Sequence, residues 1–175
     1  MGLRLFVGLD VGDAARAELA AWAARAVGED EALRLVPQER LHVTLAFLGS
    51  CDEALVAPLT AVVAAVAGPV GPLRLGPVLW LAPRRPHVLT VAVEGELAAL
   101  HARLWAALQP LGFEPEGRSF KPHVTVARVR KGARPATLEL PAPPEAQLGT
   151  TSLVLYRSHL GKAARYEPLA RASLS

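Results

Sequence analysis

LHVTLAFL (residues 41–48) and PHVTVARV (residues 122–129) are two versions of one short motif in this chain of 175 residues. Both contain His-Val-Thr, and the two histidines, His42 and His123, lie 81 positions apart, close to half the chain length. Because the sequence has only five histidines, chance is a poor explanation for two such tripeptides. A repeat kept for packing alone would preserve apolar positions, whereas this one also preserves the polar pair.

Each motif has the composition of a β-strand, in which residues i and i+2 point to the same face. His42 and Thr44 therefore share one face, while Val43 points toward a core. His123 and Thr125 share a face in the same way. If the two halves pack about a pseudo-twofold axis, two imidazoles and two hydroxyls converge on one groove.

The rest of the chain mixes strand and helix patterns. Hydrophobic periodicity and turn residues predict strands over 3–9, 41–48, 73–81, 87–93, 121–129, 151–157 and 165–171, and helices over 13–27, 54–66 and 95–108. The Pro-rich segment 132–146 is expected to be a loop with at most one short strand. This order predicts an α+β fold of two antiparallel sheets with outer helices around a central groove. No long linker interrupts it, so we expect one bilobal domain over 1–175, built by internal duplication.

Composition narrows the functional classes. With 51% apolar and 20% charged residues the chain is expected to fold compactly. The net charge of +3 is too small for a protein that grips long nucleic acid, but it suits a local anionic substrate. The single Cys51 cannot form an internal disulfide, and the N-terminal stretch resembles a strand more than a signal peptide or membrane span. We therefore expect a cytoplasmic protein, without membrane association.

Two histidines and two threonines on one groove suit phosphodiester chemistry. Imidazoles with an unperturbed pKa near 6.5 can act as a base and an acid at neutral pH. Hydroxyl donors can hold the non-bridging phosphate oxygens. The sequence contains no HxH, HxxxH or CxxC pattern and no phosphate-binding GxxxxGK[ST] loop, so neither a metal nor a nucleotide cofactor is expected.

HVTL (42–45), HVTV (123–126), RLFVGLD near the start, LAFLG after the first motif, FKPHVTVAR around the second, and LYRSHLGKAARYEPLA near the end together resemble the 2H phosphoesterase superfamily. The nearest group is the RNA 2',3'-cyclic phosphodiesterases, historically called 2'-5' RNA ligases, and the resemblance spans nearly the whole chain. It implies metal-free hydrolysis of a 2',3'-cyclic phosphate to a 2'-phosphomonoester. His42 would then donate a proton to the leaving 3' oxygen and His123 would activate water. Thr44 and Thr125 would bind the phosphate.

Two further residues are weaker candidates. Arg128 lies five positions after His123, so on a regular strand it faces the other way and reaches phosphate only where the strand bends or bulges. The resemblance nevertheless implies a phosphate-binding arginine here. Phe47, five after His42, either stacks on a nucleobase or packs in the core. We expect Tyr156 and Tyr166 in the core or at its rim, and a surface or structural role for His159. His87 and His101 are expected to be incidental, with His101 on the exposed side of its helix.

Three functions remain open from the sequence. The leading one is hydrolysis of RNA or oligonucleotides with a 2',3'-cyclic phosphate end by a monomeric enzyme. The second is 2'-5' ligation, the reverse reaction on the same acid and base. The third is a nucleotide- or RNA-binding module without turnover. An intact pair of histidines favours an enzyme, because a binding module needs no matched acid and base.

Overall fold

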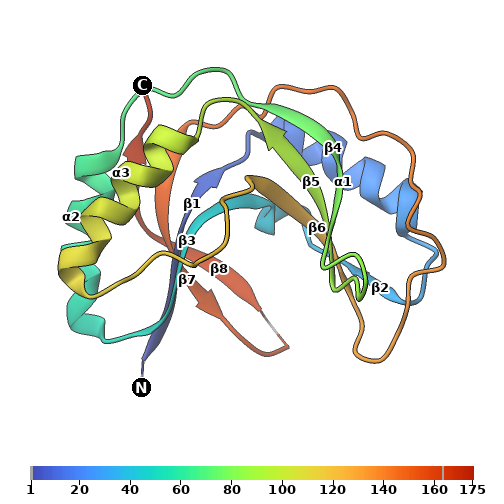
Figure 1. Cartoon of the computed structure of the whole chain (residues 1–175), viewed down its shortest axis with the longest axis horizontal. Coiled ribbons are helices and arrows are strands. Elements are labelled where there is room, and N and C mark those ends of the chain that lie inside the picture. The colour runs from blue at the N-terminus through green and yellow to red at the C-terminus, as the bar shows by residue number, and fades with distance from the viewer. Residues whose placement is uncertain (1, 163) are drawn as a thin grey trace.

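A computed structural model describes residues 2–162 and 164–175. The strands are β1 (Leu3–Asp10), β2 (Leu33–Leu35), β3 (His42–Cys51), β4 (Arg74–Leu81), β5 (Val88–Glu94), β6 (His123–Val129), β7 (Ser152–His159) and β8 (Arg165–Ser173). The α-helices are α1 (Asp13–Val27), α2 (Val56–Val66) and α3 (Ala98–Leu108), with 3-10 turns η1 (Gln38–Arg40), η2 (Glu53–Leu55) and η3 (Gln109–Leu111). The ribbon curves into an arch with helices at both ends (Figure 1).

The strands pair antiparallel in the order β4-β5-β6-β3-β1-β7-β8, with β2 beside β6. β3 and β6 meet in the middle through one residue pair, Val43 opposite Val124. The two halves that the sequence predicted as separate antiparallel sheets are therefore joined at this seam into one eight-stranded sheet. The α+β prediction is confirmed. Strand order is symmetric about the seam, since β3, β1 and β7 on one side match β6, β5 and β4 on the other.

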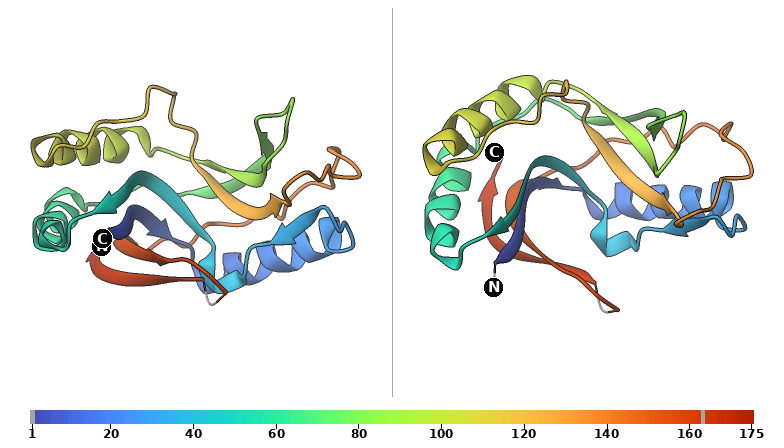
Figure 2. Two further views of the ribbon diagram at one scale, coloured as in Figure 1. Left: turned by 90° about the horizontal axis from the view of Figure 1, so that it is seen from below. Right: turned by 60° about the horizontal axis from the view of Figure 1, so that its bottom comes forward.

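Two of the helices follow a strand of one half of the sheet and pack on the other half. β1 leads into α1, which packs against β6, and β5 leads into α3, which packs against β3. α2 packs on α3 and on the β7–β8 pair. Figure 2 shows α2 and α3 together at one end of the arch and α1 at the other. Each half of the sheet is thus covered by a helix that begins in the other half, which ties the halves together.

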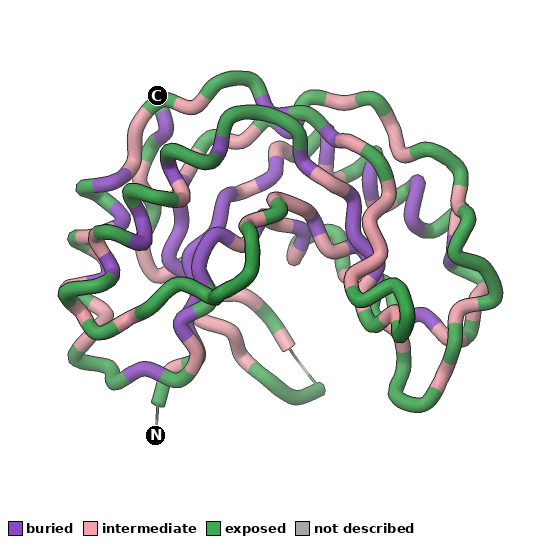
Figure 3. The backbone as a smooth tube through the Cα atoms, in the orientation of Figure 1, coloured by how far each residue is buried: buried purple, intermediate pink, exposed green. Residues whose placement is uncertain are grey.

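The helices form because their apolar residues recur on one side. In α1 the buried side includes Leu19, Trp22 and Val27, which recur at helical spacing. α3 buries Leu100, Leu104 and Leu108 in the same way. Figure 3 shows the buried positions following the strands and the inner sides of the helices.

Several elements differ from the sequence prediction in their bounds or in their presence. The third helix begins at Ala98 and not at 95, because Gly95 adopts a φ of 138° that a helix cannot contain. β2 was not predicted, since three residues carry too little periodicity and only their pairing with β6 makes them a strand. The segment 132–146 is a loop without a strand, which agrees with the expectation of at most one short strand; the nearest pairing is an isolated bridge between Arg74 and Gln147.

Candidate active site

The seam places the four motif residues on one face of the sheet, called here the motif face. Val43 and Val124 pair directly and both are fully buried on the opposite face. Neighbours of an antiparallel pair also lie across from each other, so His42 is adjacent to Thr125 and Thr44 to His123. The central valines of the two motifs lie at the local twofold axis of the ladder. The predicted convergence of two imidazoles and two hydroxyls follows from this register.

β6 contains a bulge immediately after its motif. Consecutive residues of β5 pair with Thr125 and Ala127, so the intervening Val126 has no partner on that side. An extra residue reverses the alternation of side chains beyond it. Arg128 consequently points to the motif face with His123, and its positive charge acts on the imidazole of the first motif. From the sequence, Arg128 could reach a phosphate only if the strand bends or bulges. The bulge in β6 meets this condition.

β3 contains the same bulge at the equivalent position. Consecutive residues of β1 pair with β3 residues on either side of Leu45, which places Phe47 on the motif face with His42. The Phe47 side chain is 44% exposed, and the guanidinium of Arg4 lies 4.6 Å from its ring centroid. The alternative that Phe47 packs in the core is therefore wrong, while its stacking on a base stays a prediction.

Both histidines are oriented by the same local hydrogen bond. Nδ1 of His42 donates to the carbonyl of Arg40 at 2.8 Å, and Nδ1 of His123 donates to the carbonyl of Lys121 at 2.6 Å. A carbonyl only accepts, so the proton of each neutral ring is on Nδ1. Nε2 is left in both rings as the atom that can take or give a proton.

The His42 imidazole is enclosed. Its ring centroid lies 4.8 Å from that of Phe6, 5.1 Å from Tyr166 and 6.0 Å from Tyr156, and its Nε2 is 2.8 Å from Thr44 Oγ1. Burial lowers the pKa of His42 to about 4. The neighbouring positive charges act in the same direction, whereas the hydrogen bond to the Arg40 carbonyl opposes them. His42 is therefore neutral at pH 7 in the free protein, with Thr44 donating to Nε2.

His123 is half-buried and less enclosed. In the described part of the chain its Nδ1 is the ring atom with a hydrogen bond, and no aromatic ring packs on it. Gly8 explains part of the difference: a Cβ there would lie 3.4 Å from Cδ2 of His42 and 2.7 Å from the Val43 carbonyl oxygen. The glycine lets the His42 ring lie against β1, and the matching position in β5 is the buried Thr90.

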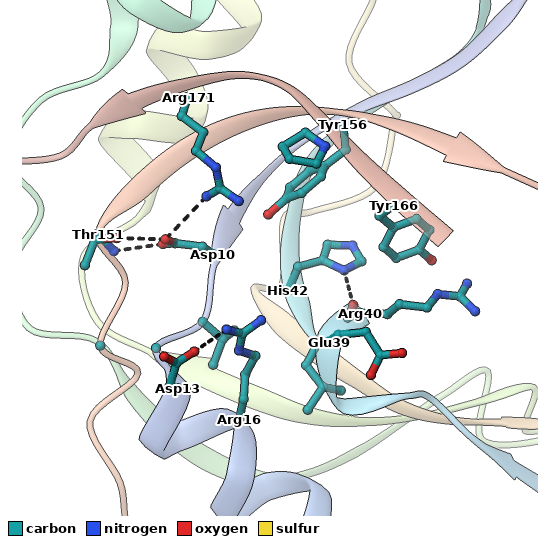
Figure 4. Close-up of a pocket in the computed structure, with 15 residues that line it drawn as sticks. Asp10, Asp13, Arg16, Glu39, Arg40, His42, Thr151, Tyr156, Tyr166 and Arg171 are labelled. Atoms are coloured by element: carbon teal, nitrogen blue, oxygen red, sulfur yellow. Dashed lines mark hydrogen bonds and ion pairs between the residues drawn. The ribbon is translucent and has the colours of Figure 1, made fainter. Parts of the chain in front are cut away.

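A cavity of about 360 Å³ lies next to His42 (Figure 4). Its lining residues are Asp10, Val11, Gly12, Asp13, Arg16, Glu39, Arg40, Leu41, His42, Gly149, Thr151, Tyr156, Tyr166, Pro168 and Arg171. His123 is outside this lining, so the cavity extends the site on the His42 side. The sequence prediction placed Tyr156 and Tyr166 in the core or at its rim and did not single out the arginines.

The sequence around Tyr156 and Tyr166 contains little that would predict their place beside His42. Tyr156 and Tyr166 sit in strands that read as ordinary β-segments, and their approach to His42 depends on the pairing of β1, β7 and β8. Two histidines expected to be incidental or structural can also be placed. His159 bonds Glu167 at 2.6 Å, as a structural histidine would. His101 was expected on an exposed side, which is wrong, because its half-buried ring stacks on Phe120 at 3.8 Å.

The described residues contain neither a metal-binding cluster nor a membrane-spanning helix. No group of three or more potential metal-binding side chains occurs among residues 2–162 and 164–175. None of the helices in these ranges combines the length and the apolar character required to cross a bilayer.

Paired His-x-Thr strands on one face of an antiparallel α+β fold define the 2H phosphoesterase class. The profile of the 2'-5' RNA ligase superfamily matches residues 11–162, and the chain belongs to this superfamily. The family predicted from the motifs is thereby confirmed.

Individual relatives agree with this assignment. An RNA 2',3'-cyclic phosphodiesterase of Geobacillus stearothermophilus is 34% identical over 77% of this chain and 46% of its own length. One of Aeropyrum pernix is 35% identical over 62% of this chain and 64% of its own. The chain thus spans less than two thirds of both relatives. The structure of E. coli LigT in complex with 3'-AMP matches with a TM-score of 0.79 at 26% identity, covering 100% of this chain and 99% of that one.

Proposed function

We propose that this protein hydrolyses the 2',3'-cyclic phosphate at RNA 3' ends to a 2'-phosphomonoester. The observation that carries the proposal is the seam, where two imidazoles held through Nδ1 by backbone carbonyls and two threonine hydroxyls share one face. Its support from relatives is the activity named for the Geobacillus and Aeropyrum proteins and the 3'-AMP bound by LigT.

The proposed reaction uses the two histidines in opposite roles. Nε2 of His123 removes a proton from water, whose oxygen attacks phosphorus as the bond to the 3' oxygen breaks. Nε2 of His42 gives its proton to that 3' oxygen, so the 2'-phosphomonoester and a free 3' hydroxyl remain. Thr44 and Thr125 donate to the non-bridging oxygens, and Arg128 adds a positive charge there.

His42 gains the proton it needs from the binding step. In the free protein its pKa is about 4, lowered by burial and by nearby positive charge. A bound phosphate brings negative charge next to the ring and offsets the charges of Arg128 and His123. The pKa of His42 therefore rises when substrate binds, and the acid forms in the complex.

The organisation of the chain supports a duplicated origin. The proposal includes a single domain over 1–175 in which each half supplies one motif, and the symmetric strand order, crossing helices and paired bulges all favour this origin. One chain carries both histidines and both threonines, so we propose a monomer. The buried free thiol of Cys51 fits the reducing cytoplasm, which is where we place the enzyme.

The deciding experiment uses a short RNA that ends in a 2',3'-cyclic phosphate. The purified protein is incubated with it in EDTA, and the product is separated from authentic 2'- and 3'-phosphate standards. We expect the 2'-phosphomonoester, because the proposed acid, base and phosphate donors are all side chains. Binding without turnover would favour the binding module, and turnover only after a divalent ion is restored would contradict the metal-free mechanism.

A further inference from the structure

The cavity beside His42 is lined by three arginines from three different elements. Arg16 comes from α1, Arg40 from η1 and Arg171 from β8. Figure 4 shows Arg16 and Arg171 extending toward the cavity from opposite sides, with the Tyr156 hydroxyl directed between them. Burial raises the pKa of the Tyr156 hydroxyl; the charge of Asp10 acts in the same direction, and the charges of Arg171 and Arg16 oppose it.

The arginines hold hydrogen-bond donors without acceptors. Among the described residues, the buried side-chain nitrogen and oxygen atoms that lack a partner are Nε of Arg16 and Nε of Arg40. A buried donor without a partner is costly, more so on a charged group, and such atoms call for an explanation. Both atoms belong to guanidiniums that line this cavity, and an anion bound to the accessible N–H groups of these side chains would offset the cost of burying their charge.

The guanidinium N–H groups of Arg171 and Arg40 also have few hydrogen-bond partners. Arg171 lies 3.9 Å from an oxygen of Asp10, beyond hydrogen-bond distance. The guanidinium of Arg40 lies over the ring of Tyr166, 4.5 Å from its centroid, a contact that leaves its N–H groups available. Each guanidinium carries five N–H donors, so most of their capacity is unused.

The acidic residues of the cavity take up only part of this capacity. Asp13 forms an ion pair with Arg16 at the start of α1. Asp10 accepts hydrogen bonds from the backbone N–H and the hydroxyl of Thr151, each at 2.8 Å. Glu39 is exposed to solvent. Asp10 is thus already engaged, and Asp13 occupies one nitrogen of Arg16. The guanidiniums of Arg40 and Arg171 keep most of their donors for an anion.

The cavity lies where the substrate would continue. In an in-line displacement the attacking water and the leaving 3' oxygen are on opposite sides of phosphorus. With His123 at the water and His42 at the leaving oxygen, the ribose of the terminal nucleotide lies on the His42 side. The cavity includes His42 and excludes His123, so it adjoins that ribose.

We propose that this cavity binds the phosphate on the 5' side of the terminal nucleotide, which joins it to the rest of the RNA. The inference rests on the proposed function. Arginine forks match the paired oxygens of a phosphate and form charge-assisted hydrogen bonds with them. Arg16, Arg40, Arg171 and the Tyr156 hydroxyl provide such donors. The site therefore favours RNA ends over isolated nucleoside cyclic phosphates.

The test compares two substrates that differ only in this phosphate. One is adenosine 2',3'-cyclic phosphate with a free 5' hydroxyl, and the other carries a 5'-phosphate in addition. We expect kcat/KM to be about tenfold or more higher for the second with the unaltered protein. Arg171→Met and Arg40→Met should each lower this ratio toward one.

A control and three outcomes make the test decisive. Arg25→Met changes an exposed arginine of α1 outside the cavity, and it should keep the rates and the ratio of the unaltered protein. Absence of hydrolysis with both substrates would contradict the proposed function itself. Equal kcat/KM for the two substrates would overturn the phosphate site alone. A ratio that persists in both arginine variants would overturn it as well, because the preference would then arise elsewhere.

Discussion

The two motif strands orient their histidines in the same way and surround them differently. Each imidazole donates from Nδ1 to the carbonyl two residues earlier, and each strand bulges directly after its threonine. His42, however, is enclosed by aromatic rings, whereas His123 is not. A repeated local sequence therefore repeats local geometry, while the solvation of each ring is set by strands outside the repeat. Two histidines in different surroundings can serve as a proton donor and a proton acceptor.

The largest expected effect comes from removing either histidine. His42→Ala and His123→Ala should each lower kcat by about 10² to 10⁴, equivalent to about 3 to 5 kcal/mol of transition-state stabilisation. Single-turnover rates with a cyclic-phosphate RNA measure this directly, and circular dichroism confirms that each variant is folded. Near-normal turnover in one variant would restrict the chemistry to the other half.

The opposite roles can be separated by pH. Because substrate binding raises the pKa of His42, the limb that requires its protonated form should lie at higher pH in the kcat profile than in the kcat/KM profile. The residual activity of His42→Gln should lack the alkaline limb, and that of His123→Gln the acidic one. The reverse pattern would exchange the roles.

The enclosure of His42 should also appear in stability. Its pKa is about 4 in the folded protein against about 6.5 when unfolded, so between these values the unfolded chain binds more protons. Stability contributed by the neutral ring is complete above pH 6.5 and is lost as the pH falls toward 4, by about 3 kcal/mol. Urea denaturation across this range should show a shallower pH dependence in His42→Gln. The same change at the exposed His87 is the control, and an equal slope in His42→Gln and the unaltered protein would contradict the enclosure.

Arg128 tests whether the bulge in β6 serves the phosphate. Arg128→Met should lower kcat/KM by about 10- to 100-fold, the value of one hydrogen bond to a charged group. Loss of its positive charge should also move the pKa of His42 upward, which an NMR titration of that imidazole can follow. Arg130→Met, two residues later in the same segment, is the matched control. An unchanged kcat/KM for Arg128→Met would place the guanidinium away from the substrate.

The smallest effect is expected at Gly8 of β1, which lies against the His42 ring. Gly8→Ala adds a methyl group within 2.7 Å of the Val43 carbonyl oxygen and against the His42 ring, so it should cost about 1 to 3 kcal/mol of stability. The tilt it imposes on His42 should lower kcat more than it raises KM. Normal stability and kcat would show that β1 can move aside, and that the glycine is not what admits the ring.

Much of this architecture is predictable from the sequence. Local periodicity predicts the helix over 13–27. Periodicity and turn residues also predict β4 and β5, which are joined by the turn between Leu81 and Val88. The motif residues were predictable because a tripeptide repeated at half the chain length is visible without any contact. Arg128 marks the limit, since a one-residue bulge reverses its direction and depends on pairing with β5.

The sequence by itself determined the two strands, the two polar pairs and the α+β class, because alternation and helical spacing are local properties of the chain. Only the tertiary structure decided that α1 and α3 cross the seam, and that Tyr156, Tyr166 and Arg171 come to His42 from the C-terminal strands. These arrangements depend on contacts between segments that are far apart in the chain, which no local pattern encodes. The pKa of His42 belongs to the same category, because burial is a property of the assembled fold.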